Sequence, residues 1–598
     1  MNKVMIKQET ISLPTYGVGE PDKNPMFYEK RVYQGSSGKV YPLPVIDKIH
    51  DEKEDKDYNV VWLENEYIRV MVMPELGGRI QRAYDKTNDY DFVYYNQVIK
   101  PALVGLAGPW ISGGIEFNWP QHHRPSTFSP VDYKIVENKD GSATIWLNEI
   151  DKMYGTKALM GFTLHPEKSY IEISGQLYNP TNIPQTFLWW ANPAVAVNDY
   201  TQSIFPPDVH AVMDHGKRDV SEFPIAKGEY YKVDYSPGTD ISRYKNIPVP
   251  TSYMAYHSDY NFVGGYDYNK EAGVLHVANH HISPGKKQWT WGHGEFGQAW
   301  DRHLTDEDGP YIELMTGVYT DNQPDFTWLM PGEEKHFKQY FMPYKQVGEV
   351  KNASIECLIS LNVDEMIDFV VYTTEPKKNV KVILKNKKDV LFREFVKFID
   401  PTTPKKFSVK NSNYNKYDIR LIVLDEKDQE LMSYQEKEVT QLDVPEAAKA
   451  SEKPENIDSL EELYLTGLHL EQYRHATYRP EDYYLEGLSR DAGDIRLNNS
   501  YGLLLYRSGL FVESEKYFRR AKDRLLWKNP NPYNGEVLYN LGLSLKMQGR
   551  MQEAFDVIYK SVWNDAMQNK GYYQLASISS IQKKYSEALE LVNKSLEK

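Results

Sequence analysis

Cysteine is almost absent from this chain of 598 residues, because Cys357 is the only one. A single thiol excludes a disulfide within the chain and a zinc site built from several cysteines. Long apolar runs are also missing: no window approaches the roughly 18 apolar residues that a membrane helix needs, and the N-terminus contains no signal-peptide core. We therefore expect a cytoplasmic protein without a membrane partner.

An excess of positive charge is missing as well. The chain has 70 Lys and Arg against 84 Asp and Glu, a formal net charge of −14 that is spread along its length. This balance argues against a nucleic-acid partner. Aromatic residues, in contrast, reach 13%, with 46 Tyr and 12 Trp. Their flat amphipathic faces suit sugar rings, and a large β-sandwich core uses the same residues.

The length predicts three or four domains, and the pattern of residues divides the chain accordingly. Residues 1–345 contain many short strand-like runs separated by Gly, Asn and Pro, which favours a large two-sheet β-sandwich. Residues 346–442 alternate in the manner of half-buried strands and predict a smaller, immunoglobulin-like β-sandwich. Residues 443–456 are rich in Pro, Glu, Ala and Lys and are typical of an exposed linker.

From residue 457 to 598 the period becomes helical and the pattern repeats. Small or apolar residues recur with offsets of 12, 16 and 19 from the first member of each set, and the second and third sets lie 34 residues apart. The three sets are Gly502, Ser514, Phe518 and Ala521; Gly542, Ala554, Ile558 and Ser561; and Ala576, Ala588, Val592 and Ser595. This spacing predicts tetratricopeptide repeats, which usually provide a surface for a protein partner or for a homo-oligomer.

The residues with the clearest chemical content begin at Glu313. This carboxylate stands in the strand-like run Tyr311-Ile-Glu-Leu-Met, and a Trp-Leu-Met-Pro-Gly-Glu turn follows at residues 328–333. A carboxylate among apolar β-formers costs free energy unless a partner satisfies it, so Glu313 is a candidate functional group.

Four segments of the first domain concentrate Gly, aromatic and ionisable residues: residues 73–80, 113–124, 187–197 and 289–313. Each also has a purely structural interpretation. Arg79 could follow an ordinary glycine turn, residues 122–124 could form a solvated loop, and Trp189 and Trp190 could belong to a core. The histidines 280, 281 and 293 show no metal-binding spacing, so we predict no metal and no cofactor.

The order of these segments resembles the galactose mutarotase-like sugar enzymes over about residues 50–345. The resemblance rests on the Gly-Gly-Arg79 turn, the run Gly113-Gly-Ile-Glu-Phe-Asn-Trp-Pro-Gln-His-His, and the Glu313 strand with its Pro-Gly-Glu turn. It implies a β-supersandwich fold, a catalytic base at Glu313 and a sugar-binding histidine at His122 or His123. With the helical repeats added, the chain resembles an uncharacterised bacterial family of mutarotase-like domains fused to tetratricopeptide repeats.

One departure from that family changes the expected chemistry. Asn192 occupies the position of the catalytic acid histidine, and an amide cannot transfer a proton near neutral pH. Glu116, in turn, stands where the related epimerases have a non-ionisable residue. Glycosidic cleavage requires two carboxylates across a sugar, so we predict a glycoside hydrolase that uses Glu313 and Glu116.

The remaining site residues follow from this prediction. Hydroxyl binding is assigned to Arg79, His122, His123 and Arg124, and ring stacking to Trp119, Trp189 and Trp291, with Asn192 and Asp301 as further substrate contacts and Asp301 as a reserve carboxylate. Two alternatives remain open: an aldose epimerase or mutarotase that uses His122 or His123 as its acid, and a non-catalytic sugar-binding module on a repeat scaffold.

Overall fold

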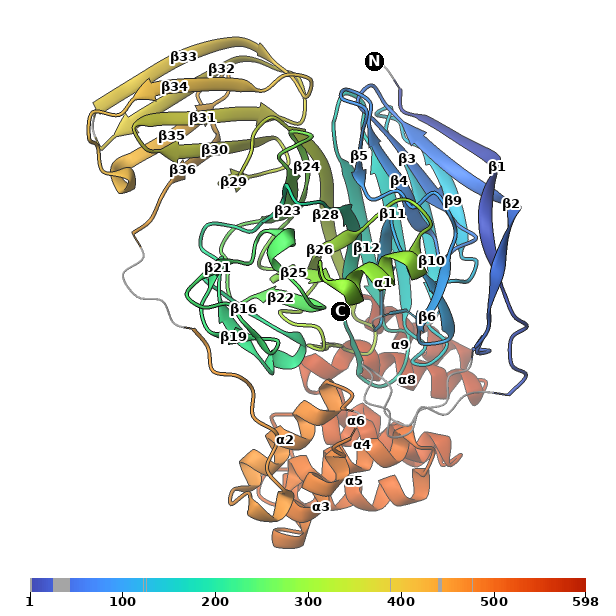
Figure 1. Cartoon of the computed structure of the whole chain (residues 1–598). Coiled ribbons are helices and arrows are strands. Elements are labelled where there is room, and N and C mark those ends of the chain that lie inside the picture. Colours follow the sequence, from blue (N-terminus) through green and yellow to red (C-terminus); the bar gives the residue numbers. More distant parts are fainter. Residues whose placement is uncertain are drawn as a thin grey trace.

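The computed structural model describes residues 3–24, 43–121, 123–124, 126–387, 389–438, 444–475 and 477–598. The chain forms a large β-sandwich, a smaller β-sandwich beside it and a layer of helices that packs under the large sandwich (Figure 1). The fold class predicted from the sequence is confirmed. Among the helices of the described residues, none is long and apolar enough to cross a membrane.

The large sandwich consists of a twelve-stranded and an eight-stranded antiparallel sheet. The order in the first is β1 (Met5–Val18), β2 (Ile49–Glu64), β3 (Ile68–Met73), β4 (Arg79–Asp85), β8 (Ile115–Asn118), β14 (Trp190–Ala196), β26 (Tyr311–Gly317), β25 (Gly285–Thr290), β22 (Thr251–Ala255), β16 (Ala211–Met213) and β17 (Val220–Glu222), with β5 (Tyr90–Val93) beside β4. The order in the second is β15 (Thr201–Ile204), β23 (Phe262–Asp267), β24 (Ala272–Ala278), β28 (Glu334–Lys345), β12 (Ile171–Tyr178), β11 (Lys157–Leu164), β10 (Ala143–Ile150) and β9 (Asp132–Glu137).

The core between the two sheets explains why Glu313 faces away from it. Side chains alternate along a strand, and on β26 Ile312 and Leu314 join the apolar core. Glu313 and Met315 therefore project from the opposite face of the twelve-stranded sheet. On the same face, helix α1 (Glu295–Leu304) and the short pair β6 (Pro101–Gly105) with β7 (Gly108–Ile111) pack against Ala194 and Tyr311. Leu188 and Phe326, which flank the short pair β13 (Gln185–Phe187) with β27 (Thr327–Leu329), contact Met315 there.

The smaller sandwich has two four-stranded sheets. One contains β29 (Asn352–Ala353), β30 (Cys357–Val363), β31 (Met366–Thr373) and β34 (Lys405–Lys410), and the other β33 (Asp389–Ile399), β32 (Lys377–Asn386), β35 (Ile419–Leu424) and β36 (Glu430–Gln435). Burial in its core raises the pKa of the Cys357 thiol to about 12. A second apolar cluster, which includes Tyr344, Leu358 and Tyr372, joins the two sandwiches.

The helical region is built from antiparallel pairs: α2 (Leu460–Gln472) with α3 (Pro480–Arg490), α4 (Ile495–Arg507) with α5 (Phe511–Leu526), α6 (Glu536–Met547) with α7 (Met551–Ser561), and α8 (Gln568–Ile581) with α9 (Tyr585–Leu596). The small residues of the repeat permit close helix contact. A Cβ on Gly502 would meet the Phe518 ring at 2.8 Å, and one on Gly542 would meet Ile558 at 2.2 Å.

Candidate functional site

The middle of the twelve-stranded sheet collects polar side chains on the face that points away from the core. In the strand register Asn192 lies opposite Glu116, Ala194 opposite Glu313, and Glu313 opposite Trp289. Directly opposed residues of antiparallel strands project to the same side of a sheet. Strands β8, β14, β26 and β25 thus bring residues from four distant parts of the sequence onto one surface.

Glu116 is buried, with 3% of its surface exposed, and it accepts hydrogen bonds from four side chains. The donors are Trp110 Nε1 at 3.0 Å, His123 Nδ1 at 2.9 Å, Thr127 Oγ1 at 2.6 Å and Asn118 Nδ2 at 3.4 Å. Burial alone would raise the pKa of Glu116, but the charge and hydrogen bond of His123, with those of Thr127 and Trp110, hold it well below its ordinary value. Glu116 is therefore an ionised carboxylate, and both of its oxygens accept hydrogen bonds.

This contact also orients His123. Because a carboxylate can only accept, Nδ1 donates to Glu116, and this hydrogen bond holds the ring in one orientation. The ring lies 5.2 Å from that of Trp110, at an interplanar angle of 53°.

Glu313 lies in the same electrostatic environment but has the opposite shift. Burial raises its pKa and the charge of Glu116 adds to the effect, whereas Lys287, His123 and a hydrogen bond from Asn192 oppose it. Burial lowers the pKa of Lys287, and Glu313 in turn opposes that shift. Both shifts favour the neutral forms of the two groups.

Lys287 is held in place by a chain of side chains. Its Nζ donates to Gln323 Oε1, which also accepts from His215 Nε2 at 3.1 Å. Ser252 Oγ bonds His215 Nδ1 at 3.0 Å. Burial and the nearby charge of Lys287 lower the pKa of His215 well below its ordinary value, so this histidine is neutral and serves the network as a relay of hydrogen bonds.

Aromatic side chains border the polar group. Trp291 stacks on Trp300 of α1 at a centroid distance of 4.2 Å and an angle of 13°, and its Nε1 donates to Tyr311 Oη at 3.2 Å. Trp289, directly opposite Glu313, is half-buried and meets Trp291 edge-on at 5.6 Å. Flat rings beside hydrogen-bonding carboxylates suit a ligand with an apolar face and a polar edge, as a sugar has.

The structure thus brings together Glu116, Glu313, His123 and Asn192 of the predicted residues, with Trp291 at the border. The Oδ1 atom of Asn192 is buried and has no hydrogen-bond partner. A buried acceptor without a partner costs free energy, which a ligand hydroxyl would recover. His122 lies outside the described residues.

The two predicted arginines have different contacts from those expected. The guanidinium of Arg79 donates to carbonyls of residues 111–113, with Nη1 2.8 Å from the first of them. Arg124 pairs with Glu149 at 2.8 Å and donates to the Gly77 carbonyl. Both side chains are buried: Arg79 holds the segment that leads into β8, and Arg124 holds the turn before β4 and pairs with β10, so hydroxyl binding does not fit their positions.

Trp119 and Trp189 also differ from the prediction. Both are fully buried, and both belong to the core between the sheets. Their rings face the opposite side of the sheet from Glu313, so sugar stacking does not fit. Asp301 is on α1, where burial raises its pKa to about 6 against the charge of Arg302. Its own charge acts on tyrosines 94 and 244 rather than on the two glutamates.

Sequence reasoning missed Lys287, His215 and Gln323. The run Gly285-Lys-Lys-Gln-Trp-Thr could have indicated Lys287. Two adjacent lysines in a strand point to opposite faces of the sheet, so at least one of them is expected to be buried. Lys286 and Lys287 are each 1% exposed. No pattern marked His215 or Gln323, which approach from irregular segments.

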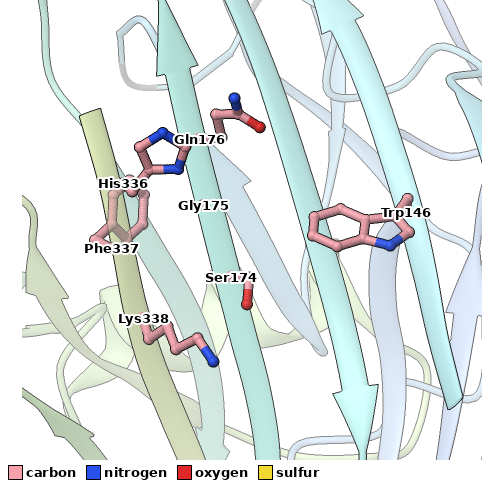
Figure 2. Close-up of a pocket in the computed structure, with 7 residues that line it drawn as sticks. All are labelled: Trp146, Ser174, Gly175, Gln176, His336, Phe337 and Lys338. Carbon is pink, nitrogen blue, oxygen red and sulfur yellow. The ribbon is translucent and has the colours of Figure 1, made fainter. Parts of the chain in front are cut away.

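A shallow hollow lies elsewhere, on the outer face of the eight-stranded sheet (Figure 2). It is lined by Trp146, Ser174, Gly175, Gln176, His336, Phe337 and Lys338. The Trp146 ring at its edge covers Gly161 on the neighbouring strand, where a Cβ would meet the ring at 2.7 Å. The hollow contains none of the predicted site residues. Within the described part of the chain, no three His, Cys, Asp or Glu side chains are grouped so that they could hold a metal ion.

Fold and site together define a two-sheet β-sandwich protein with a buried group of acidic, basic and amide side chains, joined to helical repeats. The chain belongs to the family described as Domain of unknown function (DUF5107), whose model matches residues 36–348, slightly more than half of the chain. Residues 352–434 match the second domain of YphG-like proteins.

Several solved structures are similar. A TPR-domain containing protein from Parabacteroides distasonis is 16% identical, with 99% of this chain and 86% of that chain covered and a TM-score of 0.50. A galactose mutarotase related enzyme from Lactobacillus acidophilus is 12% identical, covering 48% and 99%, with a TM-score of 0.33. A galactose mutarotase-like protein from Clostridium acetobutylicum is 10% identical, covering 48% and 96%, also at 0.33. At 16% identity the likeness to the first of these concerns the fold alone.

Proposed function

We propose that the protein is a carbohydrate-active enzyme that interconverts the anomers of a free sugar, with Glu313 and His123 as its acid–base pair. The sugar class is supported by the motif resemblance at residues 113–123 and 311–333 and by the aromatic border of the site. The observation that carries the reaction type is the 2.9 Å contact between Glu116 and His123 Nδ1. In this contact Glu116 orients His123. The oriented His123 then serves as the acid, a role that the amide of Asn192 cannot fill.

The reaction balances with these two groups. Glu313, as carboxylate, removes the proton from the anomeric hydroxyl while protonated His123 gives a proton to the ring oxygen, and the bond between C1 and that oxygen breaks. The open-chain aldehyde then rotates, and ring closure on the other face returns both protons. A raised pKa suits Glu313 as a base near neutral pH, and the Asn192 Oδ1 atom can accept a sugar hydroxyl.

Glycoside hydrolysis remains a second candidate, because the pKa values of Glu116 and Glu313 are shifted in opposite directions. Such a pair can divide the roles of acid and base. The four donors on Glu116 weigh against it, because hydrogen bonds to the ionised carboxylate stabilise its charge and so weaken it as a nucleophile or a base.

One set of assays separates these candidates. Exchange between anomers of a panel of free aldoses is followed by polarimetry and NMR, and release of nitrophenol from aryl glycosides is followed in parallel, for wild type, Glu313→Gln and His123→Asn. We expect catalysed anomer exchange that both substitutions abolish and no glycoside cleavage. Glu172→Gln is the matched control, because Glu172 forms a glutamate–histidine pair with His165 at 3.3 Å in the other sheet.

The outcomes point in different directions. Cleavage of an aryl glycoside that is lost in Glu313→Gln would establish the hydrolase instead. Sugar binding without turnover of either substrate type would leave a non-catalytic sugar-binding module.

A further inference from the structure

The turn between α2 and α3 reaches into the large sandwich beside the site. Arg474 is only 7% exposed. Its Nε donates to Thr186 Oγ1 at 2.8 Å, its Nη1 donates to Gln121 Oε1 at 3.1 Å, and its Nη2 donates to the Thr186 carbonyl. The guanidinium carbon lies over two rings, 3.7 Å from the centroid of Tyr154 and 4.6 Å from that of Phe326.

The two preceding residues bind the same part of the sandwich. Gln472 Nε2 donates to the Phe326 carbonyl at 2.6 Å, and its Oε1 accepts from Trp328 Nε1 at 3.1 Å. Tyr473 hydrogen-bonds Asp325. Three consecutive residues of the helical region are thus committed to the sandwich. Figure 1 shows the helices packed against this end of it.

The segments that Arg474 ties together are the ones that carry the site. Gln121 lies two residues before His123 in the same loop. Thr186 belongs to β13, which leads directly into β14 and Asn192. Phe326 ends the loop whose Gln323 holds Lys287. One guanidinium therefore contacts the three segments that position His123, Asn192 and Lys287 around Glu313.

We propose that the helical repeats complete the active site, and that Arg474 is the positioning residue that fixes the loop of His123 and the strand of Asn192. The inference rests on the proposed function, which supplies the reaction that these groups perform. A planar fork with five N–H donors is required, because it binds Thr186 and Gln121 in different directions while it also lies over the Tyr154 and Phe326 rings. A lysine in this place reproduces neither feature.

The test uses the full chain and the variants Arg474→Ala and Arg474→Lys. Misplacement of a catalytic group by about 1 Å costs on the order of 100-fold in rate, so we expect kcat for anomer exchange to fall by about that factor in both, with KM nearly unchanged. Guanidinium ions at millimolar concentration should restore part of kcat in Arg474→Ala and nothing in wild type.

Tyr539→Phe is the matched control, because Tyr539 Oη donates to the Asn182 carbonyl at 3.0 Å across the same interface without touching a site segment. It should keep the wild-type kcat. Arg474→Ala with wild-type kcat, a loss equal to that of Tyr539→Phe, or a loss that appears only in KM would overturn the inference.

Hydrogen exchange makes this test independent of the substrate. In Arg474→Ala, amide exchange should rise severalfold at residues 115–121 and 186–192 and stay unchanged in the smaller sandwich. Unchanged exchange in the two segments would refute the positioning role even if no sugar were turned over. Absence of turnover in wild type, with raised exchange in the variant, would refute the proposed function alone.

Discussion

Replacement of Glu116 by glutamine tests the site through both stability and activity. The substitution keeps the size of the side chain and removes the charge that Trp110, His123, Thr127 and Asn118 donate to. Hydrogen bonds to a charged group contribute about 1.5–3 kcal/mol each, and breaking a buried pair costs about 3–5 kcal/mol. The amide retains some of these bonds, so we expect a loss of about 3 kcal/mol or more at pH 7.5.

The loss should depend on pH with a definite sign. The pKa of Glu116 is depressed in the folded protein, and an unfolded glutamate titrates at about 4.3. The stabilisation by its charge is therefore fully present above that pH and disappears as the pH falls toward the folded pKa. The difference between wild type and Glu116→Gln should be constant near neutral pH and should shrink below about pH 4.

Calorimetry with tryptophan fluorescence measures this difference on the unfolding of the large sandwich. With an unfolding entropy of about 2.1 cal/mol/K per residue, a change of about 3 kcal/mol shifts the midpoint of a domain of about 345 residues by roughly 4 °C. Because His123 loses its orienting partner, kcat should also fall by on the order of 100-fold. The Glu172→Gln control removes a paired carboxylate from the other sheet and should leave kcat unchanged. A midpoint shift below about 2 °C, or a shift that does not depend on pH, would refute the reasoning.

Three further predictions concern the surroundings of Glu313. Burial raises its pKa and Lys287 opposes that shift, so Lys287→Met should raise the pKa further and move the acidic limb of the pH–rate profile to higher pH, whereas an unchanged limb would separate the two groups. A Cβ on Gly317 would approach the Trp190 ring at 2.6 Å, so Gly317→Ala should cost about 1–3 kcal/mol in denaturant unfolding, and equal midpoints would contradict this contact. Trp291→Ala should raise KM for the sugar about tenfold while Trp291→Phe raises it less, because the ring supplies the stacking face; equal KM values in a titration would exclude that role.

Much of the fold could be predicted from the sequence because its signals are local. Strand-length runs, turn residues and the repeated small residues at Gly502 and Gly542 each report on neighbours a few residues away. The candidate site was only partly predictable. Glu313 was visible because a carboxylate in an apolar strand is unusual.

The remaining site residues depend on contacts distant in sequence. Trp119 and Trp189 look the same in a sequence whether they line a core or a binding face. Arg79 turned out to bind backbone carbonyls that only the fold brings near. His215 and Lys287 meet through Gln323, more than 30 residues from either one, and no local pattern reports such a contact.

The commitment of Arg79 and Arg124 to carbonyl oxygens and to Glu149 has a consequence for selectivity. A phosphate group on a sugar is best bound by the Nη groups of an arginine, and the Nη groups of both side chains already donate to carbonyl oxygens or to Glu149. Buried arginines that are already paired in this way add little attraction for an anion, so uncharged sugars should be preferred over their phosphate esters.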